Sequence, residues 1–348
     1  MHRRKFLTYS STLLLTPIFL DSNNFLPDSD FIQTIEGKLE LSKTGLILSH
    51  EHVLVDFIGA EKFSSSRYDQ NEAFAKIIPF LMEAKRIGYS TFVECTPQYL
   101  GRDIALLMRL AKASGLNIVT NTGLYGSQNG KFLPSYVYTE TSREIADRWI
   151  KEWKNGIEGT GIKPGFIKIS VDKSPIKDFQ RKLIEAAAIA HLATGLSIAS
   201  HTGEAPAALE QIEILRTKGV HPSAFIWVHA QSEKNTDLHL QLANQWAWPS
   251  YDGIGWGNPE EYLRLLLFAK ENKFLNQVLI SHDAGWYRVG ESNGGEYKGY
   301  TTIHNMLLPL LQNNGFTNEE ISKLLVTNPG NAFQIKKRFF KPDNKVIV

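Results

Sequence analysis

The sequence predicts a single-domain α/β protein in which eight parallel strands close into a (β/α)8 TIM barrel. From Gly45 onward, short apolar segments alternate with longer segments whose apolar residues recur every three or four positions, as in buried strands and amphipathic helices. Glycines stand where the helical segments should end, at Gly88, Gly115, Gly195 and Gly219. The chain has 348 residues, and barrels of roughly 250 residues and upward fold as one unit.

The pattern opens with a predicted β-hairpin, in which residues 31–35 and 39–41 flank a Gly37-Lys38 turn. The strands predicted after it are residues 45–53, 91–96, 117–123, 166–170, 197–201, 225–230, 248–253 and 278–283. The helices predicted between them are residues 71–86, 103–114, 143–155, 180–194, 205–217, 236–245 and 259–271. An open doubly wound sheet is the alternative, but no glycine-rich phosphate loop follows the first strand, as that fold would favour.

The first twenty residues differ from the rest of the chain. Arg3-Arg4-Lys5 precede a short apolar run at residues 13–20, which is typical of a secretory signal peptide, and the paired arginines suggest twin-arginine export. We therefore expect a signal peptide at 1–20, a polar linker at 21–30, the barrel at 31–348, and a periplasmic or secreted protein. A non-cleaved anchor or a disordered N-terminus is the alternative, although the run is short for a membrane span.

Composition narrows the classes of function. The formal net charge is +2, so the sequence offers no electrostatic case for binding nucleic acid. After signal removal no other segment is long and apolar enough to cross a membrane. The single cysteine, Cys95, excludes an intrachain disulfide, and we interpret it as a buried thiol in an apolar strand rather than a catalytic one.

The first predicted strand of the barrel ends in His50-Glu51-His52. Successive side chains of a strand point to opposite faces, so His50 and His52 share one face and Glu51 takes the other. Two imidazoles on one face can chelate a metal ion. A solvated or packing pair is the alternative, since this motif alone is only moderately specific.

Other strands place ligand-type side chains at the same end, where reactive residues of such barrels gather. His201 ends the fifth predicted strand, His229 the sixth, and Asp283 adds a carboxylate after the eighth. Each histidine alone is more often structural, but the set in matching positions indicates a metal centre. His282 should then point away, in a structural or supporting role.

The fourth predicted strand directs a lysine into the barrel. Ile167 and Ile169 face the helices, so Lys168 faces inward. A buried, unpaired ammonium is costly and would repel a metal ion. Either Lys168 pairs with an inward carboxylate such as Glu94, or carbon dioxide carbamylates it into an anionic oxygen ligand that bridges two metal ions. The position alone favours neither interpretation.

Together these residues resemble the phosphotriesterase family of the amidohydrolase superfamily. The resemblance runs from about Phe31 to about Phe333. Its matching segments are Leu48–His52, Gly101–Asp103, Asn121–Tyr125, Gly156–Glu158, Thr160–Ile162, Gly165–Lys168, Ala193–Gly195, His201-Thr202, His229, His282-Asp283 and Thr327–Pro329.

The resemblance implies a hydrolase with two divalent metal ions, for which the mixed nitrogen and oxygen ligands favour zinc. The implied ligands are His50 and His52 for the more buried ion, His201 and His229 for the more exposed ion, Lys168 as the carbamylated bridge, and Asp283, which would also act as acid/base. A hydroxide shared by the two ions would attack an ester, lactone or phosphotriester. Since relatives are often dimers, the resemblance also raises the expectation of a homodimer.

The expected substrate is a small molecule, and the residues that would contact it are Tyr125, Trp286 and Arg288. Tyr125 stands where phosphotriesterases proper tend to have tryptophan and lactone-cleaving relatives tyrosine, which favours a lactone or carboxylic ester. The loop at 284–299 resembles neither subgroup. One alternative is an organophosphate triester hydrolase. Another is a non-catalytic metal-dependent binding protein, which would not need both Lys168 and Asp283.

Overall fold

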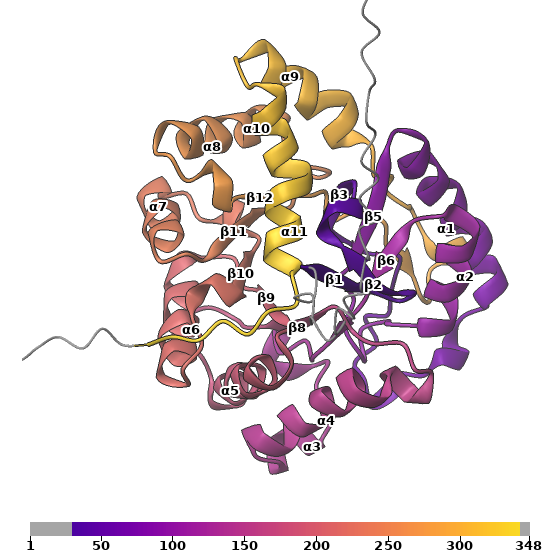
Figure 1. The fold of residues 1–348 in the computed structure, drawn as a ribbon. Coiled ribbons are helices and arrows are strands. Elements are labelled where there is room, and N and C mark those ends of the chain that lie inside the picture. The colour runs from indigo at the N-terminus through magenta and orange to yellow at the C-terminus, as the bar shows by residue number, and fades with distance from the viewer. Residues whose placement is uncertain (1–29, 342–348) are drawn as a thin grey trace, which may run out of the picture.

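The computed structural model describes residues 30–341 and confirms the (β/α)8 TIM barrel (Figure 1). The predicted signal peptide, and all but the last residue of the predicted linker, lie outside the described residues. The hairpin is present, with β1 at Phe31–Thr34 and β2 at Gly37–Glu40 paired antiparallel.

The barrel wall is parallel throughout. Its strands, in their order around the barrel, are β3 Leu46–Glu51, β5 Tyr89–Glu94, β6 Asn117–Val119 with β7 Asn121–Thr122, β8 Phe166–Ser170, β9 Ser197–His201, β10 Phe225–Val228, β11 Trp248–Tyr251 and β12 Leu279–Ile280. The third predicted strand is interrupted at Thr120, whose carbonyl oxygen accepts a hydrogen bond from Gly165 N at 2.7 Å.

Side chains help to close the barrel between its first and last strands. Ser49 Oγ donates to the carbonyl oxygen of Ile280 at 3.0 Å, and His50 N donates to Ser281 Oγ at 2.8 Å. Asp283 N then donates to the carbonyl oxygen of His50 at 3.1 Å. These bonds fix Asp283 beside the end of β3. A short outer ladder pairs β4 Leu54–Val55 with β13 Tyr287–Arg288.

Each predicted helix is present to within two residues. The helices are α1 Gln70–Arg86, α2 Ile104–Ser114, α3 Tyr136–Thr139, α4 Ser142–Asn155, α5 Asp178–Thr194, α6 Ala205–Thr217, α7 Thr236–Asn244, α8 Pro259–Glu271, α9 Leu308–Asn313, α10 Asn318–Ser322 and α11 Asn328–Phe333. Side-chain caps set several starts: the Asp69 carboxylate accepts the first free N–H groups of α1, and Thr141 forms a capping box at α4.

The sequence predicted no helix after the eighth strand, and α9 to α11 show why. They are short, two π-helical stretches interrupt them, and Pro309 and Pro329 stand at their first turns. Proline lacks an amide N–H and suits only the start of a helix. The periodic signal is therefore too broken to be recognised as one helix.

The interior of the barrel and the layer between strands and helices form two apolar clusters. The interior cluster contains Cys95, as expected for a buried thiol, together with Ile32 of the hairpin and Phe333 of α11. The hairpin and α11 lie across the amino-terminal end of the barrel (Figure 1), and Ile35 N donates to the carbonyl oxygen of Ile118. The carboxyl end is left for function.

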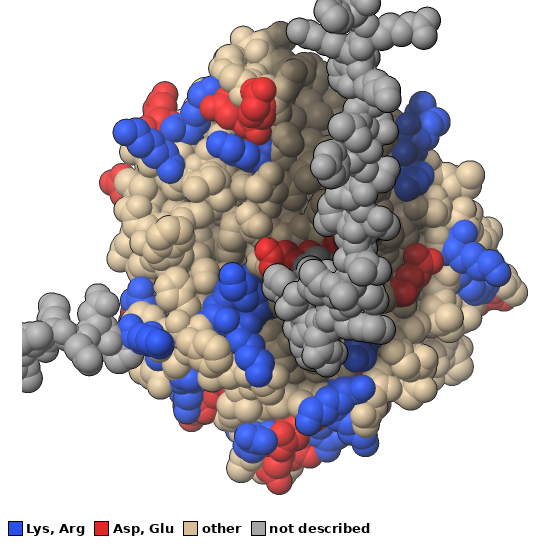
Figure 2. Space-filling model, viewed as in Figure 1, with Lys and Arg blue, Asp and Glu red and all other residues tan. Residues whose placement is uncertain are grey.

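The surface shows no field of one sign on the face drawn in Figure 2, where basic and acidic side chains are interspersed. Within residues 30–341, none of the helices combines the length and apolar character needed to cross a bilayer.

Candidate metal centre

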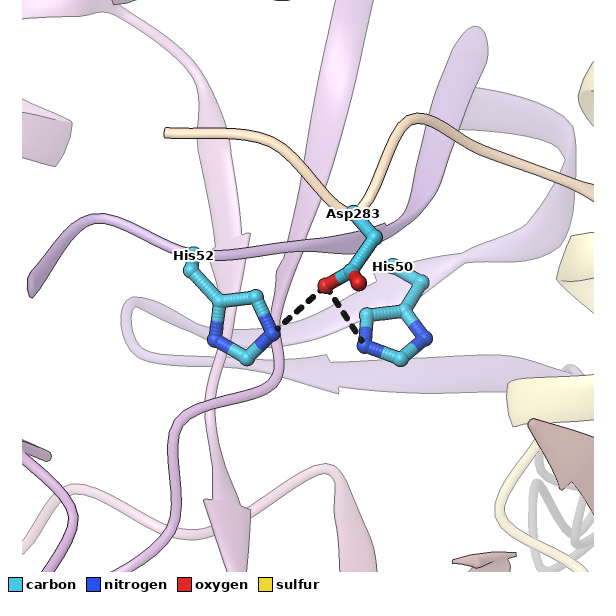
Figure 3. A group of neighbouring side chains, drawn as sticks. All are labelled: His50, His52 and Asp283. Carbon is cyan, nitrogen blue, oxygen red and sulfur yellow. Dashed lines mark ion pairs between the residues drawn. The ribbon is translucent and has the colours of Figure 1, made fainter. Parts of the chain in front are cut away.

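Three side chains at the carboxyl end of the barrel converge on one point (Figure 3). Asp283 Oδ1 lies 3.1 Å from His52 Nε2 and 3.6 Å from His50 Nε2. Within residues 30–341 this buried oxygen accepts no hydrogen bond. An oxygen and two imidazole nitrogens, all within 4.8 Å of one another, suit a divalent metal ion such as zinc.

The other candidate ligands lie beside this group. His229 Nε2 is 2.8 Å from His201 Nδ1, and their rings meet edge to face with centroids 4.4 Å apart. Lys168 Nζ lies 3.3 Å from His50 Nε2. The structure therefore brings together all six residues for which the sequence predicted metal binding.

A buried carboxylate links the two halves of the centre. Asp252 Oδ2 accepts from His50 Nδ1 at 3.1 Å, and Asp252 Oδ1 accepts from His229 Nδ1 at 2.7 Å. Gln231 Nε2 also donates to Oδ1. Such bonds fix the tautomer, so the Nε2 lone pairs of both histidines face the centre. Asp252 is not among the residues predicted from the sequence, although a carboxylate at the end of the seventh predicted strand was a signal for it.

The remaining two histidines have hydroxyl partners. His52 Nδ1 lies 2.8 Å from Thr96 Oγ1, and His201 Nε2 lies 3.1 Å from the Tyr125 hydroxyl. Each of these hydroxyls orients an imidazole whose other nitrogen faces the candidate ligands. Tyr125 is thus adjacent to the centre.

Glu51 fixes the end of the eighth strand from the opposite face. Its Oε1 accepts hydrogen bonds from Ser281 Oγ, His282 N and His282 Nδ1, and its Oε2 accepts from Ala284 N. His282 Nε2 in turn accepts from Ile303 N at 3.0 Å. His282 therefore points away from the centre, in the structural role expected of it.

Lys168 is 2% exposed, and within residues 30–341 no carboxylate lies within ion-pairing distance of it. Glu94, which the sequence offered as a possible partner for Lys168, instead accepts a hydrogen bond from Thr96 N at 3.1 Å. Burial raises the pKa of Glu94 to about 7. Gly123 packs against the main chain of Lys168 in β8, because a Cβ on Gly123 would lie 2.0 Å from the carbonyl oxygen of Lys168.

Burial keeps most of the imidazoles neutral. Burial, followed by the charge of Lys168, lowers the pKa of His50 to about 4 and that of His52 to about 3. Burial and the neighbouring His229 hold the pKa of His201 well below its usual value. A neutral imidazole has a lone pair to give to a metal ion, so these three histidines are ready ligands at neutral pH.

Charges reverse this trend at His229. Burial alone would lower its pKa, but the Asp252 and Asp283 carboxylates together outweigh burial and raise it. Burial opposes ionisation of Asp252, yet His229 and His50 hold its pKa well below the usual value. Burial raises the pKa of Asp283, in spite of the same two histidines.

The loop after β12 brings Trp286, a predicted substrate residue, to the centre, and it places Arg288 on the β4–β13 ladder. The Trp286 ring lies 4.9 Å from that of His52 and 5.6 Å from that of Phe57. Arg288 lies on the outer β4–β13 ladder, 3.7 Å from Glu291, and within residues 30–341 no hydrogen bond or ion pair joins it to the ligands.

Comparison with known proteins identifies the family of this chain. Residues 30–333 match the family model described as the phosphotriesterase family. The chain belongs to the phosphotriesterase family. It is 30% identical over 300 residues to the phosphotriesterase homology protein of Escherichia coli, covering 85% of this chain and 100% of that protein. It is also 30% identical to the aryldialkylphosphatase of Saccharolobus solfataricus, covering 86% of this chain and 98% of that one.

A solved structure from the phosphotriesterase family gives the same result in three dimensions. That structure belongs to work on the molecular engineering of organophosphate hydrolysis activity from a weak promiscuous lactonase template. It superposes with a TM-score of 0.79 at 25% identity, covering 87% of this chain and 99% of that one. Family membership supports a hydrolase that uses metal ions, and the donor set of His50, His52 and Asp283 fits such ions.

Proposed function

We propose that the protein is a binuclear metal-dependent hydrolase that cleaves a lactone or carboxylic ester. The observation that carries the proposal is the convergence of Asp283 Oδ1 with the Nε2 atoms of His50 and His52, beside the His201–His229 pair. These are two groups of nitrogen and oxygen donors, with Lys168 Nζ 3.3 Å from His50 Nε2, which suits two ions, with zinc favoured.

In this proposal Lys168 carries a carbamate. Its neutral amine adds to the carbon of carbon dioxide, a nitrogen–carbon bond forms, and one proton leaves. The product is an anion, so Lys168, which meets no carboxylate within residues 30–341, would offer an oxygen ligand to the bound ions. Bound divalent ions supply a nucleophile at neutral pH and polarise the carbonyl of the substrate.

The chain's own residues do the rest. Asp283 holds a proton well, because burial raises its pKa, and its Oδ atoms lie beside the ligands where a proton must be taken up and passed on. Asp252 and Thr96 keep the imidazoles oriented. The Trp286 ring packs between His52 and Phe57 and would form an apolar wall on one side of the centre.

Tyr125 supports the lactone or ester as substrate. Its hydroxyl lies against His201, and the resemblance associates tyrosine at this position with lactone-cleaving members. The similarity to a structure derived from a lactonase template points the same way. An organophosphate triester is the second candidate, supported by 30% identity to an aryldialkylphosphatase.

Metal content tests the centre directly. We expect about two metal ions per chain in wild-type protein loaded with zinc and bicarbonate, as measured by elemental analysis. Labelled ¹³C-bicarbonate should give a carbamate carbon signal in the NMR spectrum. Lys168→Ala should lose that signal, the bridged ions and hydrolysis together. The exposed Lys173, which pairs with Glu204, provides the control Lys173→Ala.

Substrate assays separate the candidates. We expect wild-type protein to cleave members of a lactone and aryl ester panel faster than an aryl phosphotriester, measured as kcat/KM. The opposite order would favour the organophosphate triester. Two bound ions with retention of a lactone and no turnover would favour a non-catalytic binding protein, and absence of bound metal would refute the proposal.

We also propose that the protein is exported. The basis is the sequence alone, Arg3-Arg4-Lys5 followed by an apolar run. Cell fractionation should find the chain outside the cytoplasm, and Arg3→Lys/Arg4→Lys should retain it inside if the route is twin-arginine export. Unchanged location in the double variant would refute that route.

A further inference from the structure

Two loops bring tryptophans to a single main-chain atom. Trp256, in the loop after β11, donates from Nε1 to the carbonyl oxygen of Asp283 at 2.7 Å. Trp286, in the loop after β12, donates to the same oxygen at 2.8 Å. A carbonyl oxygen offers two lone pairs, so the two indoles satisfy it completely.

The backbone at Asp283 is in a conformation that needs such support. Its φ is +52°, and Trp286 has φ +78°. Residues other than glycine rarely occupy this left-handed region, and they stay there only where surrounding contacts enforce it. This conformation directs the Asp283 carboxylate toward His50 and His52, as Figure 3 shows.

The loop that carries Trp286 is held tightly against the end of β3, the first strand of the barrel. A Cβ on Gly285 would lie 1.7 Å from the carbonyl oxygen of His52, so only glycine fits. Gly285 and Lys298 also exchange two main-chain hydrogen bonds of 3.0 Å. The Trp286 indole therefore has little freedom to leave the Asp283 carbonyl.

The loop that carries Trp256 is held from outside. Lys298 Nζ donates to the carbonyl oxygen of Gly255 at 3.0 Å and lies 3.6 Å from the centre of the Trp256 ring. This is a close cation–π contact. The two indoles meet edge to face at 6.2 Å. Trp256 is 48% exposed, so its hydrogen bond is the one that water can replace.

We propose that Trp256 and Trp286 are positioning residues, which act together through the carbonyl oxygen of Asp283 to aim its carboxylate at the metal ligands. The inference rests on the proposed function, since it assigns a role to the acid/base residue of that reaction. It extends the catalytic apparatus to two loops whose sequences contain no ligand.

The test compares Trp256→Phe, Trp286→Phe and the double variant, because phenylalanine keeps an aromatic ring and removes the N–H. The control is Trp246→Phe, an indole that is 58% exposed and precedes β11 at the other end of the barrel. The readouts are kcat and KM for the lactone or aryl ester that wild-type protein cleaves best, and the rate at which a chelator removes bound zinc.

Loss of one hydrogen bond should lower kcat by about fivefold while KM changes little. Trp286→Phe should have the larger effect, because water can replace the more exposed donor at Trp256. The double variant should lose more than the product of the single losses, since Asp283 then has neither indole donor. Zinc release should accelerate in the same order.

A double variant with wild-type kcat and zinc release would overturn the inference, and so would a double loss equal to the product of the single losses. In both cases active wild-type protein leaves the proposed function standing. Wild-type protein that neither binds zinc nor cleaves the panel overturns the proposed function and the inference together.

Discussion

The buried histidines of this barrel fall into two groups, the candidate metal ligands and the others. The two groups differ in what their rings contact. In His191, His239 and His282, which are not candidate ligands, both ring nitrogens form hydrogen bonds to main-chain atoms or to side chains outside the centre. His191, for example, donates from Nδ1 to the carbonyl oxygen of Leu196 and accepts at Nε2 from Arg338 N. These rings are complete without a ligand.

The histidines at the carboxyl end of the barrel have an orienting partner on one side only, and on the other side they meet one another, Lys168 or Asp283. His50 and His229 each donate to Asp252, and His52 meets Thr96, while the other nitrogen of each ring faces another residue of the centre. The comparison teaches that burial alone does not mark a ligand. What marks it is an imidazole oriented by one partner whose other nitrogen faces further ligand-type side chains.

Exchanging one histidine of each kind for alanine should give the largest contrast. His50→Ala should weaken zinc binding by at least about 100-fold, because losing only an orienting partner already costs 10–100-fold. His282→Ala should keep the zinc and lower the free energy of unfolding by about 3 kcal/mol, since it leaves the buried Glu51 carboxylate short of a donor. Chelator competition and urea unfolding measure the two quantities. If both variants lost the same zinc affinity and the same free energy of unfolding, the distinction between the two groups of histidines would be wrong.

The complete ring of His191 predicts a pH dependence. Burial lowers its pKa to about 4 from an ordinary 6.5. Between these values the unfolded chain binds the extra proton, so this residue's contribution to stability is full above pH 6.5 and is lost as pH falls toward 4, by about 3 kcal/mol. His191→Gln keeps a donor and an acceptor without titrating. Its metal-free unfolding free energy should therefore fall less steeply with acid than that of metal-free wild-type protein.

The orienting carboxylate can be tested without touching a ligand. Asp252→Asn should weaken zinc binding by about 10–100-fold, because an amide has only one oxygen to accept from two imidazoles. The exposed Asp237 on α7 gives the matched control Asp237→Asn. Wild-type affinity in Asp252→Asn would show that the ligands need no such partner.

The smallest effect is expected at the hydroxyl that contacts His201. Tyr125→Phe removes that contact and keeps the ring, so kcat/KM should fall by about fivefold, the worth of one hydrogen bond. Tyr138→Phe, at a half-exposed tyrosine on α3, should leave kcat/KM unchanged. A rise in activity on removing the hydroxyl would contradict the orienting role.

The sequence predicted the barrel well because each long element has its own periodic signal. Helix α6 begins and ends where the spacing predicts, at Ala205 and Thr217. The alternation of side chains along a strand was enough to separate His50 and His52 from Glu51. By contrast, the helices from α9 onward are too short and too broken by proline to give a period.

The parts of the centre that the sequence did not predict depend on distances between strands. Asp252 acts by lying between His50 and His229, which belong to other strands, and no local pattern records that. The role of Trp256 depends on a carbonyl in another loop. Arg288 was predicted as a wall of the substrate pocket, and its place on the β4–β13 ladder beside Glu291 depends on a strand pairing that no local pattern records.

The closure of the amino-terminal end has a consequence for how the chain is made. Ile32 and Phe333 fill the same end of the barrel, and Ile335 N donates to the carbonyl oxygen of Phe31. The apolar side chain of Ile32 is therefore synthesised long before that of Phe333, which helps to cover it. During synthesis the growing chain must carry an open, apolar interior, and that is the interval in which aggregation or a chaperone can intervene.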